Sequence, residues 1–409
     1  MGVEISYMGT KRRLAGVVSD IVKKLPEGSM LDAFSGMCAV GEALAPSRQI
    51  WTNDIQVFPA LVAKALFCSQ TGPISSDYIK RILERPFQQN MKALEEKFKS
   101  SLRKERRYLD TEALDDVIAG NTKLPYIGND KKLESERQNL STKTNTFPYR
   151  LATITYVGSF FGVKQCMAID SLRYAIDIAV AKKNINSEQR NWAIIALGQV
   201  LNRINNSTGQ FAEFIKPSEN NIGRIIQKRR RSVWDEFFLA LDSISPFGSQ
   251  EWRLRNHSFR SDTLLLLNEM TKHKYRPAIV YADPPYSSAQ YSRYYHVLDV
   301  LVEYRYPPVT GVGRYPDKRF QTQFSHSRTV LNSMTKLVES AAKLRSCLIL
   351  SYPENGLFCK QGGSIIDLLR CHYKYVDVAY SEKQQHSTFG GQRRAPKVSV
   401  VENVFVAHD

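Results

Sequence analysis

An apolar run at positions 278–282, Ala-Ile-Val-Tyr-Ala, leads directly into Asp283-Pro284-Pro285-Tyr286. A short run of β-branched and aromatic residues predicts a buried strand, and the prolines end it because they have a fixed φ and no backbone N–H. The strand therefore ends in a carboxylate, rigidly directed carbonyl groups and an aromatic ring. An ordinary strand-to-turn junction is the alternative interpretation, since Asp and Pro both favour turns.

The residue types in this motif suit the binding of a planar amino group. The Asp283 carboxylate can accept one N–H hydrogen and the Pro284 carbonyl the other, which shifts the nitrogen lone pair out of ring conjugation. Tyr286 would stack on the face of a base flipped out of a duplex. The motif therefore indicates an adenine as ligand, although the same geometry can hold any exocyclic amino group, including cytosine N4.

Composition limits the class of partner. The chain has 409 residues, enough for two or three domains or for one catalytic domain with a large insertion. Its formal net charge of +17 predicts a polyanionic partner, because fixed positive charge attracts phosphates. Double-stranded DNA is the leading candidate, and an anionic membrane surface is the alternative.

Other compositional features point to a soluble protein of the cytoplasm without a membrane partner. We find no apolar run of about 18 residues, and the N-terminal residues lack the pattern of a secretory signal. The cysteines are scattered and form no Cys-x-x-Cys pair, so we expect neither a metal site nor a disulfide framework. They stand at Cys38, Cys68, Cys166, Cys347, Cys359 and Cys371.

The first 70 residues have the pattern of a nucleotide-binding unit. A short strand ends in Asp32-Ala33-Phe34-Ser35-Gly36 and enters a helix, a turn where a cofactor can approach the backbone. The next strand, at 49–55, contains Asp54 near its end, and a carboxylate there suits ribose hydroxyl groups. The full G-x-G-x-x-G fingerprint is missing, which disfavours NAD, and the pattern alone does not identify the cofactor.

The remainder predicts an α/β sheet that is interrupted and later completed. Helical patterns at 81–107, 170–182 and 187–205 surround a polar segment, 120–147, that we expect to be a loop. Basic clusters at 103–107 and 228–231 are candidates for phosphate contact or for solvated helix faces. Strand patterns then return: residues 259–262 end one strand, and further strands are expected at 278–282, 346–352, 375–380 and 398–407.

Four signals, taken in order along the chain, resemble the α-group, Dam-type N6-adenine DNA methyltransferases. Ser6-Tyr7-Met8-Gly9-Thr10-Lys11-Arg12 is similar to the family's N-terminal segment, and Asp32-Ala33-Phe34-Ser35-Gly36 to its cofactor motif. Asn53-Asp54 resembles the ribose-binding acid, and Asp283-Pro284-Pro285-Tyr286 the catalytic motif.

The resemblance extends to about half of the chain and leaves 76–150 uncovered. Segments 206–211, 287–296 and 350–352 are similar to a subset of the family. One departure concerns Cys38, which stands where many relatives have a second glycine. His296, within the second of these segments, is interpreted as a structural histidine in preference to a substrate contact.

The resemblance implies a Rossmann-like class I methyltransferase sheet with helices on both faces, interrupted by a mainly helical insertion. Residues 1–75 and 256–409 would form the catalytic domain, and 76–255 would recognise the DNA target. The cofactor implied is S-adenosyl-L-methionine, with no metal. Its implied contacts are Tyr7, Lys11, Asp32, Phe34, Gly36, Asp54 and Asp262, and the implied catalytic residues are Asp283, Pro284, Pro285 and Tyr286.

The expected function is site-specific methylation of adenine N6 in duplex DNA, as the modification enzyme of a restriction-modification or related defence system. A cognate restriction endonuclease acting separately would then be a further partner. Cytosine-N4 methyltransferases more often carry Ser in place of Asp283, and related RNA or protein glutamine methyltransferases usually carry Asn. A catalytically silent DNA-binding subunit with the same fold is the alternative from another functional class.

Overall fold

The structure is a computed structural model that describes residues 3, 12–122, 130–142, 146–207, 210–273, 276–386 and 398–409. The chain divides into two compact units. The sheet unit comprises Gly9–Gln70, Pro246–Ser292 and Phe320–Asp409, and the helical unit comprises Met1–Met8, Thr71–Ser245 and Arg293–Arg319. Among the described residues, no helix is long and apolar enough to cross a membrane.

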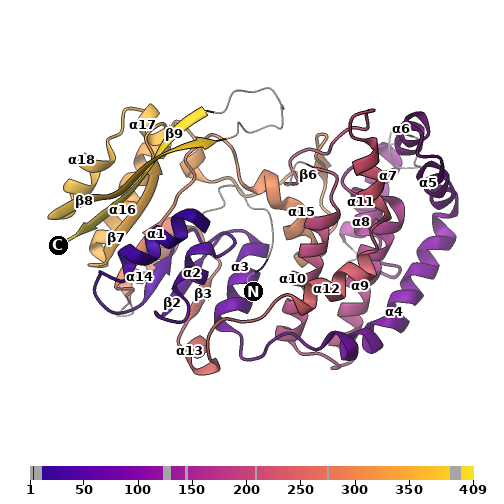
Figure 1. Cartoon of the computed structure of the whole chain (residues 1–409), viewed down its shortest axis with the longest axis horizontal. Coiled ribbons are helices and arrows are strands. Elements are labelled where there is room, and N and C mark those ends of the chain that lie inside the picture. Colours follow the sequence, from indigo (N-terminus) through magenta and orange to yellow (C-terminus); the bar gives the residue numbers. More distant parts are fainter. Residues whose placement is uncertain are drawn as a thin grey trace. The chain divides into compact units, whose positions relative to one another are not determined.

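A seven-stranded sheet organises the sheet unit, in the order β3-β2-β1-β4-β7-β9-β8 (Figure 1). Strands β3, β2, β1, β4 and β7 are mutually parallel, and β9 is antiparallel to its neighbours β7 and β8. This mostly parallel sheet confirms the predicted α/β class and has the Rossmann-like class I methyltransferase fold. The strands are β1 (Met30–Asp32), β2 (Ile50–Asn53), β3 (His257–Phe259), β4 (Ile279–Ala282), β7 (Cys347–Pro353), β8 (Tyr375–His386) and β9 (Val398–His408).

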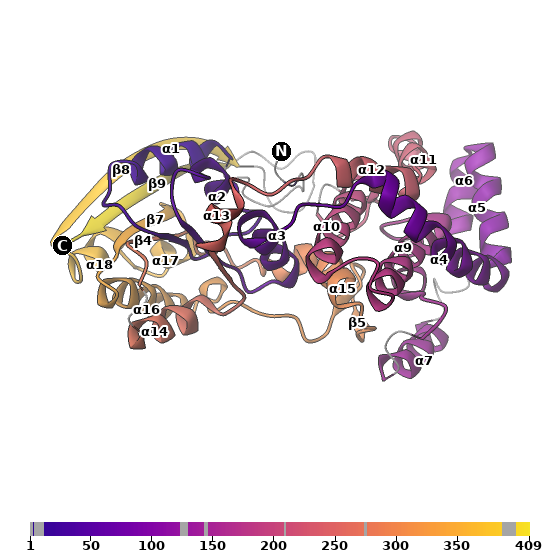
Figure 2. The same cartoon turned by 90° about the horizontal axis from the view of Figure 1, so that it is seen from below.

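Helices cover both faces of this sheet, and its central strands are therefore buried on both sides. Leu31, Val280 and Leu348 pack with α14 and α16 in one apolar cluster, whereas Met30 and Ile279, which alternate with them, are buried outside that cluster. Figure 2 shows α1 and α2 on the side of the sheet opposite to α14 and α16. The helices of this unit are α1 (Arg12–Val22), α2 (Ala39–Leu44), α3 (Val57–Cys68), α13 (Gln250–Leu254), α14 (Thr263–Lys272), α16 (Val330–Lys343), α17 (Leu357–Lys360) and α18 (Ile365–Arg370), with the 3-10 helix η1 (Gln323–Ser325).

The strand that 259–262 were expected to end stops three residues earlier than Asp262. Strand β3 stops at Phe259, and Asp262 is the N-cap of α14, where its Oδ1 accepts the backbone N–H groups of Leu264 at 2.9 Å and Leu265 at 3.2 Å. An Asp in this position satisfies donors that the helix itself cannot satisfy. Local capping therefore outweighs continuation of the strand.

The helical unit contains two departures from the expected helices. The single helix expected at 81–107 is two helices, which separate at Phe98, where φ is −112° and ψ is 24°. The segment expected to be a loop, 120–147, contains a helix at Asp130–Ser141, because its Lys, Leu, Glu, Arg and Gln residues are strong helix formers. The elements of this unit are α4 (Ser76–Lys97), α5 (Lys99–Thr111), α6 (Leu114–Thr122), α7 (Asp130–Ser141), α8 (Leu151–Thr155), α9 (Val163–Ala181), α10 (Ser187–Ile204), α11 (Ile222–Arg230), α12 (Val233–Asp242) and α15 (Ser292–Glu303), with the strands β5 (Val309–Thr310) and β6 (Tyr315–Pro316).

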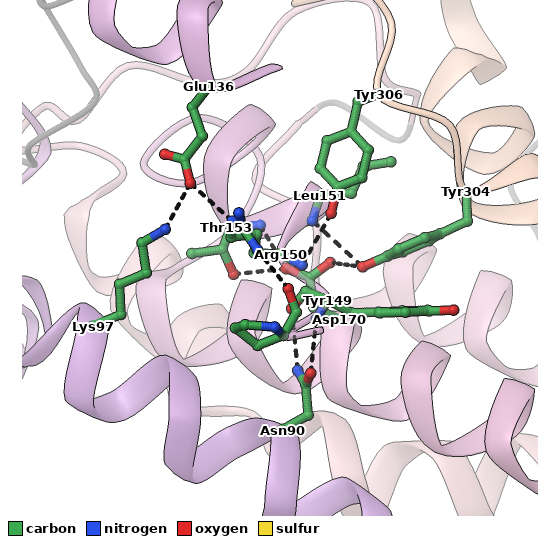
Figure 3. Close-up of polar contacts among 11 residues, drawn as sticks. Asn90, Lys97, Glu136, Tyr149, Arg150, Leu151, Thr153, Asp170, Tyr304 and Tyr306 are labelled. Atoms are coloured by element: carbon green, nitrogen blue, oxygen red, sulfur yellow. Dashed lines mark hydrogen bonds and ion pairs between the residues drawn. The ribbon is translucent and has the colours of Figure 1, made fainter. Parts of the chain in front are cut away.

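A buried carboxylate joins three segments of the helical unit (Figure 3). Asp170 of α9 is fully buried, and it accepts the N–H groups of Ala152 and Thr153 at 2.8 Å, the Thr153 hydroxyl at 2.7 Å and the Tyr304 hydroxyl at 2.6 Å. Burial raises the pKa of Asp170 to about 6, although each of these donors favours the ionised form. The carboxylate therefore holds the first turn of α8 and the end of the α15 segment against α9.

We expect Asp170→Asn to destabilise the helical unit by about 2 kcal/mol, because the new amide NH2 would face two donors in a buried site. The variant no longer has to bury a charged carboxylate, but this gain offsets only part of the lost stability. Calorimetric unfolding of the full chain measures the change, and Asp110→Asn, at an exposed position on α5, is the matched control. An unchanged transition in Asp170→Asn would show that the four hydrogen bonds contribute no net stability.

A segment that follows Asp283-Pro284-Pro285-Tyr286 in the sequence packs with the helical unit. Arg293–Arg319 belongs to that unit, whereas the family resemblance places 256–409 in a single domain. Side chains account for this packing: Arg293 pairs with Glu213 at 2.8 Å, and His296 contacts the Phe211 carbonyl oxygen at 3.1 Å. The assignment of the two units to catalysis and target recognition remains a prediction.

Candidate functional site

The predicted site residues of the sheet unit gather at one edge of its sheet. Asp32 ends β1, and its backbone lies in register with Thr52 of β2 and Tyr281 of β4. Asp54 and Asp283 directly follow β2 and β4, so all three acids lie at the carboxyl ends of adjacent parallel strands. The chain moves outward from β1 to β2 and β3 and then returns to the other side of β1 at β4. This reversal is the topological switch point, where open α/β sheets bind ligands.

The β1–α2 turn, Ala33–Cys38, is held by the carboxylate of Asp54. The Gly36 N–H donates to Asp54 Oδ2 at 3.0 Å, and the Gln56 N–H donates to its Oδ1 at 2.8 Å. Gly36 has a φ of 47°, which favours glycine, and Cys38 has a φ of 67°. The position where many members of the resembled family carry a second glycine therefore has a glycine-like backbone conformation here too.

Negative charge is concentrated around this turn. Burial raises the pKa of Asp54 to about 6, and the N–H groups of Gln56 and Gly36 oppose that rise. The Cys38 thiol is fully buried, and its pKa is raised first by burial and then by the charges of Asp32, Glu42 and Asp54. The thiol is therefore neutral and unreactive at ordinary pH, and the acids beside it favour a ligand with positive charge.

Asn53 has a positioning role that the sequence pattern did not reveal. Its amide nitrogen donates to the carbonyl oxygens of Ala33 at 3.2 Å and Ser261 at 3.1 Å, and its amide oxygen accepts the Ser261 N–H at 3.1 Å. Thr263 also donates to the Ala33 carbonyl, at 2.9 Å. Asn53 thus ties the β1–α2 turn to the start of α14. Its position next to Asp54 was the only available sign.

The remaining predicted cofactor contacts have different surroundings. Phe34 is half-buried, and its ring meets Phe324 edge-on at a centroid distance of 5.5 Å. Asp262 caps α14, which accounts for this carboxylate without a ligand, so its contact with a cofactor stays a prediction. Tyr7 and Lys11 lie outside the described residues.

The motif Asp283-Pro284-Pro285-Tyr286 follows β4 and is anchored to the core by its tyrosine. Tyr286 is half-buried against the apolar cluster, and its carbonyl oxygen accepts the Leu357 N–H at 2.7 Å. Its hydroxyl pKa is raised by burial first, then by the charges of Asp283 and Glu402. Pro284 is buried, whereas Asp283 and Pro285 are half-buried. The motif therefore has a fixed backbone with a partly accessible carboxylate and ring.

The loop after this motif is clamped by a segment distant in the sequence. The side-chain amide of Gln290 bonds the backbone of Thr322 twice. Its Oε1 accepts the Thr322 N–H at 2.8 Å, and its Nε2 donates to the Thr322 carbonyl oxygen at 3.3 Å. The Ser325 hydroxyl donates to the Ala289 carbonyl at 3.1 Å. Phe324, between these residues, reaches Phe34 of the β1–α2 turn. The segment 322–325 thus connects the loop that follows Tyr286 with the turn that follows β1, a link without any sequence signal.

His296 is part of the helical unit and has a structural environment. It is buried, its Nε2 lies 3.1 Å from the Phe211 carbonyl oxygen, and burial lowers its pKa to about 3. A neutral, buried ring tied to the backbone supports the interpretation of a structural histidine.

The two basic clusters differ in how their cations are used. In 228–231, Lys228 bonds the Asn205 carbonyl oxygen, Arg229 is buried against Tyr108, and Arg230 pairs with Glu112 at 2.7 Å. In 103–107, Glu105 is buried and accepts the first N–H groups of α9, while Arg103, Lys104, Arg106 and Arg107 are exposed. Internal contacts thus engage most of the cations in 228–231, whereas 103–107 offers an exposed basic helix face. Phosphate contact by either cluster remains a prediction.

Comparison with known proteins gives relatives with one common activity in their names. The chain is 22% identical, over 87% of its length, to modification methylase StsI of Streptococcus sanguinis, and it spans 45% of that protein. It is 20% identical, over 79% of its length, to modification methylase LlaI of Lactococcus lactis subsp. lactis, of which it spans 42%. The Type II methyltransferase M.CviAII of Paramecium bursaria Chlorella virus 1 is 22% identical over 99% of the chain and 98% of its own length.

These matches extend through most of the chain at low identity. The chain spans about half the length of StsI and LlaI, while its match to M.CviAII runs from end to end. No protein-family model matches it. The chain thus resembles modification methylases in sequence and has a methyltransferase fold.

Proposed function

We propose that the protein is a DNA methyltransferase that transfers a methyl group from S-adenosyl-L-methionine to N6 of a flipped-out adenine in duplex DNA. The observation that carries the proposal is the position of Asp283-Pro284-Pro285-Tyr286, which follows β4 next to the β1–α2 turn at the switch point of the sheet. The names of the relatives and the net charge of +17 support a nucleic-acid substrate.

The residues around the β1–α2 turn fit this cofactor. Asp54 uses one acceptor position on each oxygen for Gly36 and Gln56, and a carboxylate offers about four positions in all, so acceptors remain for ribose hydroxyls. The negative charges of Asp32, Glu42 and Asp54 near Cys38 complement a ligand with a sulfonium and an ammonium group. We propose that Asp32, Phe34, Gly36 and Asp54 hold the cofactor, together with Tyr7, Lys11 and Asp262 as the resemblance implies.

The cofactor supplies a methyl group already activated by the positive charge on sulfur. The protein then has to position the amino nitrogen and stabilise the charge that develops on it as the new C–N bond forms and the C–S bond breaks. Asp283 and the Pro284 carbonyl would accept the two N–H hydrogens, and Tyr286 would support the base by stacking. The Tyr286 carbonyl oxygen accepts the Leu357 N–H, and Gln290 ties the loop after Tyr286 to Thr322. These contacts support a pre-positioned motif.

The helical unit is the candidate for target recognition. Its exposed basic face on α5 suits phosphate contacts, which position a protein on DNA, and base contacts within the unit would supply specificity. Because the relatives are named modification methylases and Type II methyltransferases, we propose that the chain modifies DNA within a restriction-modification or related defence system. A cognate endonuclease would then recognise the same site.

Methyl transfer from labelled S-adenosyl-L-methionine to unmethylated mixed-sequence duplex DNA tests the proposal, with nucleoside analysis of the product. We expect N6-methyladenine, and sequencing of the modified DNA then identifies the target site. Detection of N4-methylcytosine would show that cytosine, and not adenine, is the substrate base. DNA binding without transfer would favour the silent DNA-binding subunit, and transfer only to RNA or protein would reject DNA as substrate.

A further inference from the structure

A small hairpin of the helical unit exposes an apolar residue at its tip. Strands β5 and β6 pair antiparallel, with Thr310 opposite Tyr315, and a turn at 311–314 joins them. The Arg314 N–H donates to the Gly311 carbonyl at 3.1 Å, which closes the turn, and Val312 projects from it with 59% of its surface exposed. Most of the surface of this β-branched apolar residue is therefore not packed within the fold.

The position of this tip is determined by close packing beneath it. The Tyr315 hydroxyl donates to the Ala212 carbonyl, and Gly313 lies against both groups, so that a Cβ at this position would overlap them. Gly311 and Arg314 have φ values of 69° and 55°, the left-handed region that is costly for a residue with a side chain. The hairpin is thus held in one conformation, including an unfavourable one at Arg314, with Val312 outward. Strained, well-held turns of this kind are typical of ligand-contacting sites.

Two guanidinium groups lie close to the ring of Tyr315. The guanidinium of Arg293 lies 5.1 Å from the ring centroid and that of Arg319 lies 4.8 Å from it. Arg293 is paired with Glu213, and Arg319 donates from Nη1 to the Pro316 carbonyl oxygen at 3.3 Å. The buried Nε of Arg319 has no acceptor among the described residues. Lys318 is exposed beside them. Over 305–319 there are four cations and one acid, Arg305, Arg314, Lys318 and Arg319 against Asp317.

We propose that the β5–β6 hairpin enters a groove of DNA, where Val312 makes an apolar base contact and Lys318 and Arg319 contact phosphates. A two-stranded ribbon fits the major groove, and an apolar side chain there can contact a thymine methyl group. The charge around the tip complements the phosphates on either side of a groove. This inference rests on the proposed function, and it makes Val312 a specificity-determining residue.

Two variants test the two parts of the inference, and both replace exposed side chains. Val312→Ser removes the apolar contact and should weaken binding to a duplex containing the target site by about tenfold. Its matched control is Val378→Ser, which changes a valine with 48% exposure on β8. Lys318→Gln should reduce the slope of log K against log salt concentration by about 0.9, the value for one phosphate contact. Lys182→Gln, at an exposed position in the same unit, should leave the slope unchanged.

Fluorescence anisotropy with labelled duplexes, with and without the target site, measures both effects. The loss in Val312→Ser should be larger on the duplex with the site, since a base contact is made only there. Wild-type affinity in Val312→Ser, or a wild-type salt slope in Lys318→Gln, overturns the inference. If the wild-type protein binds DNA but transfers no methyl group, the proposed function fails, while the salt slope of Lys318→Gln on mixed-sequence duplex still tests the phosphate contact of the hairpin.

Discussion

Asp283→Ala is expected to lower methyl transfer by about 10²–10³-fold, with little change in the affinity for S-adenosyl-L-methionine or DNA. In the proposed reaction the carboxylate interacts most strongly with the amino nitrogen as positive charge develops on it, so its loss affects the chemical step more than binding. Asp283 is half-buried between buried Ala282 and Pro284, and its truncation removes no apolar group from the core. The fold should therefore survive the change.

Single-turnover rates on duplex DNA measure this effect, alongside calorimetric titration of the cofactor. Asp283→Asn keeps an acceptor oxygen and should fall between wild type and Asp283→Ala, which separates the charge from the hydrogen bond. Asp377→Ala, at an exposed position of β8 in the same sheet, is the matched control and should behave as wild type. A full rate in Asp283→Ala, with an unchanged melting temperature, would remove Asp283 from the mechanism.

Asp54→Ala is expected to weaken cofactor binding by about tenfold to a hundredfold, the range for losing hydrogen bonds to a charged group. The variant removes the proposed acceptor for the ribose, and it releases Gly36 and Gln56, whose N–H groups bond the carboxylate at 3.0 and 2.8 Å. Calorimetric titration with S-adenosyl-L-methionine gives the affinity, and Asp377→Asn serves as the control. Wild-type affinity in Asp54→Ala would exclude this carboxylate from cofactor binding.

The raised pKa of Asp54 gives this prediction a pH dependence with two opposite signs. Burial raises the pKa from 3.8 to about 6, so between these values the folded state binds more protons than the unfolded state. The contribution of Asp54 to the unfolding free energy is therefore largest below pH 3.8 and is lost as pH rises through about 6. Cofactor affinity should change in the other direction, rising as the carboxylate ionises near pH 6.

Asp54→Asn cannot titrate, so it should lose both dependences. Parallel measurements of unfolding and of cofactor titration between about pH 4 and pH 8 compare it with wild type. If the two proteins show the same change of affinity with pH, another group controls binding. This comparison also separates the charge of Asp54 from its structural role, since Asn retains an acceptor for Gly36 or Gln56.

Local sequence patterns were sufficient where the physical cause is local. Prolines end β4 because they lack a donor, glycine permits the φ of 47° at Gly36, and apolar runs mark the strands that are buried on both faces. The same reasoning failed where two local preferences compete. At 259–262 the capping of α14 by Asp262 ends the strand pattern, and at 130–141 helix propensity prevails in a polar segment that lacks a clear period.

The acidic residues of the candidate site could be predicted from the sequence, whereas the residues that hold its loops in place could not. Asp32, Asp54 and Asp283 could be identified because Asp32 ends a strand and the other two directly follow one, and parallel strands end at the same edge. The clamp formed by Gln290, Thr322 and Phe324 could not, because its partners are distant in sequence and chemically ordinary. The burial of Arg229 against Tyr108 was hidden in the same way, because these two residues are also distant in sequence.

The sequence by itself determined the α/β class, the order of the strand-end motifs and the excess of positive charge, because these depend on residue type and on periods of a few residues. Only the tertiary structure decided that β4 lies beside β1, that Asn53 ties a turn to α14, and that 293–319 packs with the helical unit. It also decided that Tyr315 anchors the β5–β6 turn to Ala212, with the guanidinium groups of Arg293 and Arg319 close to its ring. These features arise from side chains that meet across long stretches of chain, and no local pattern encodes such pairings.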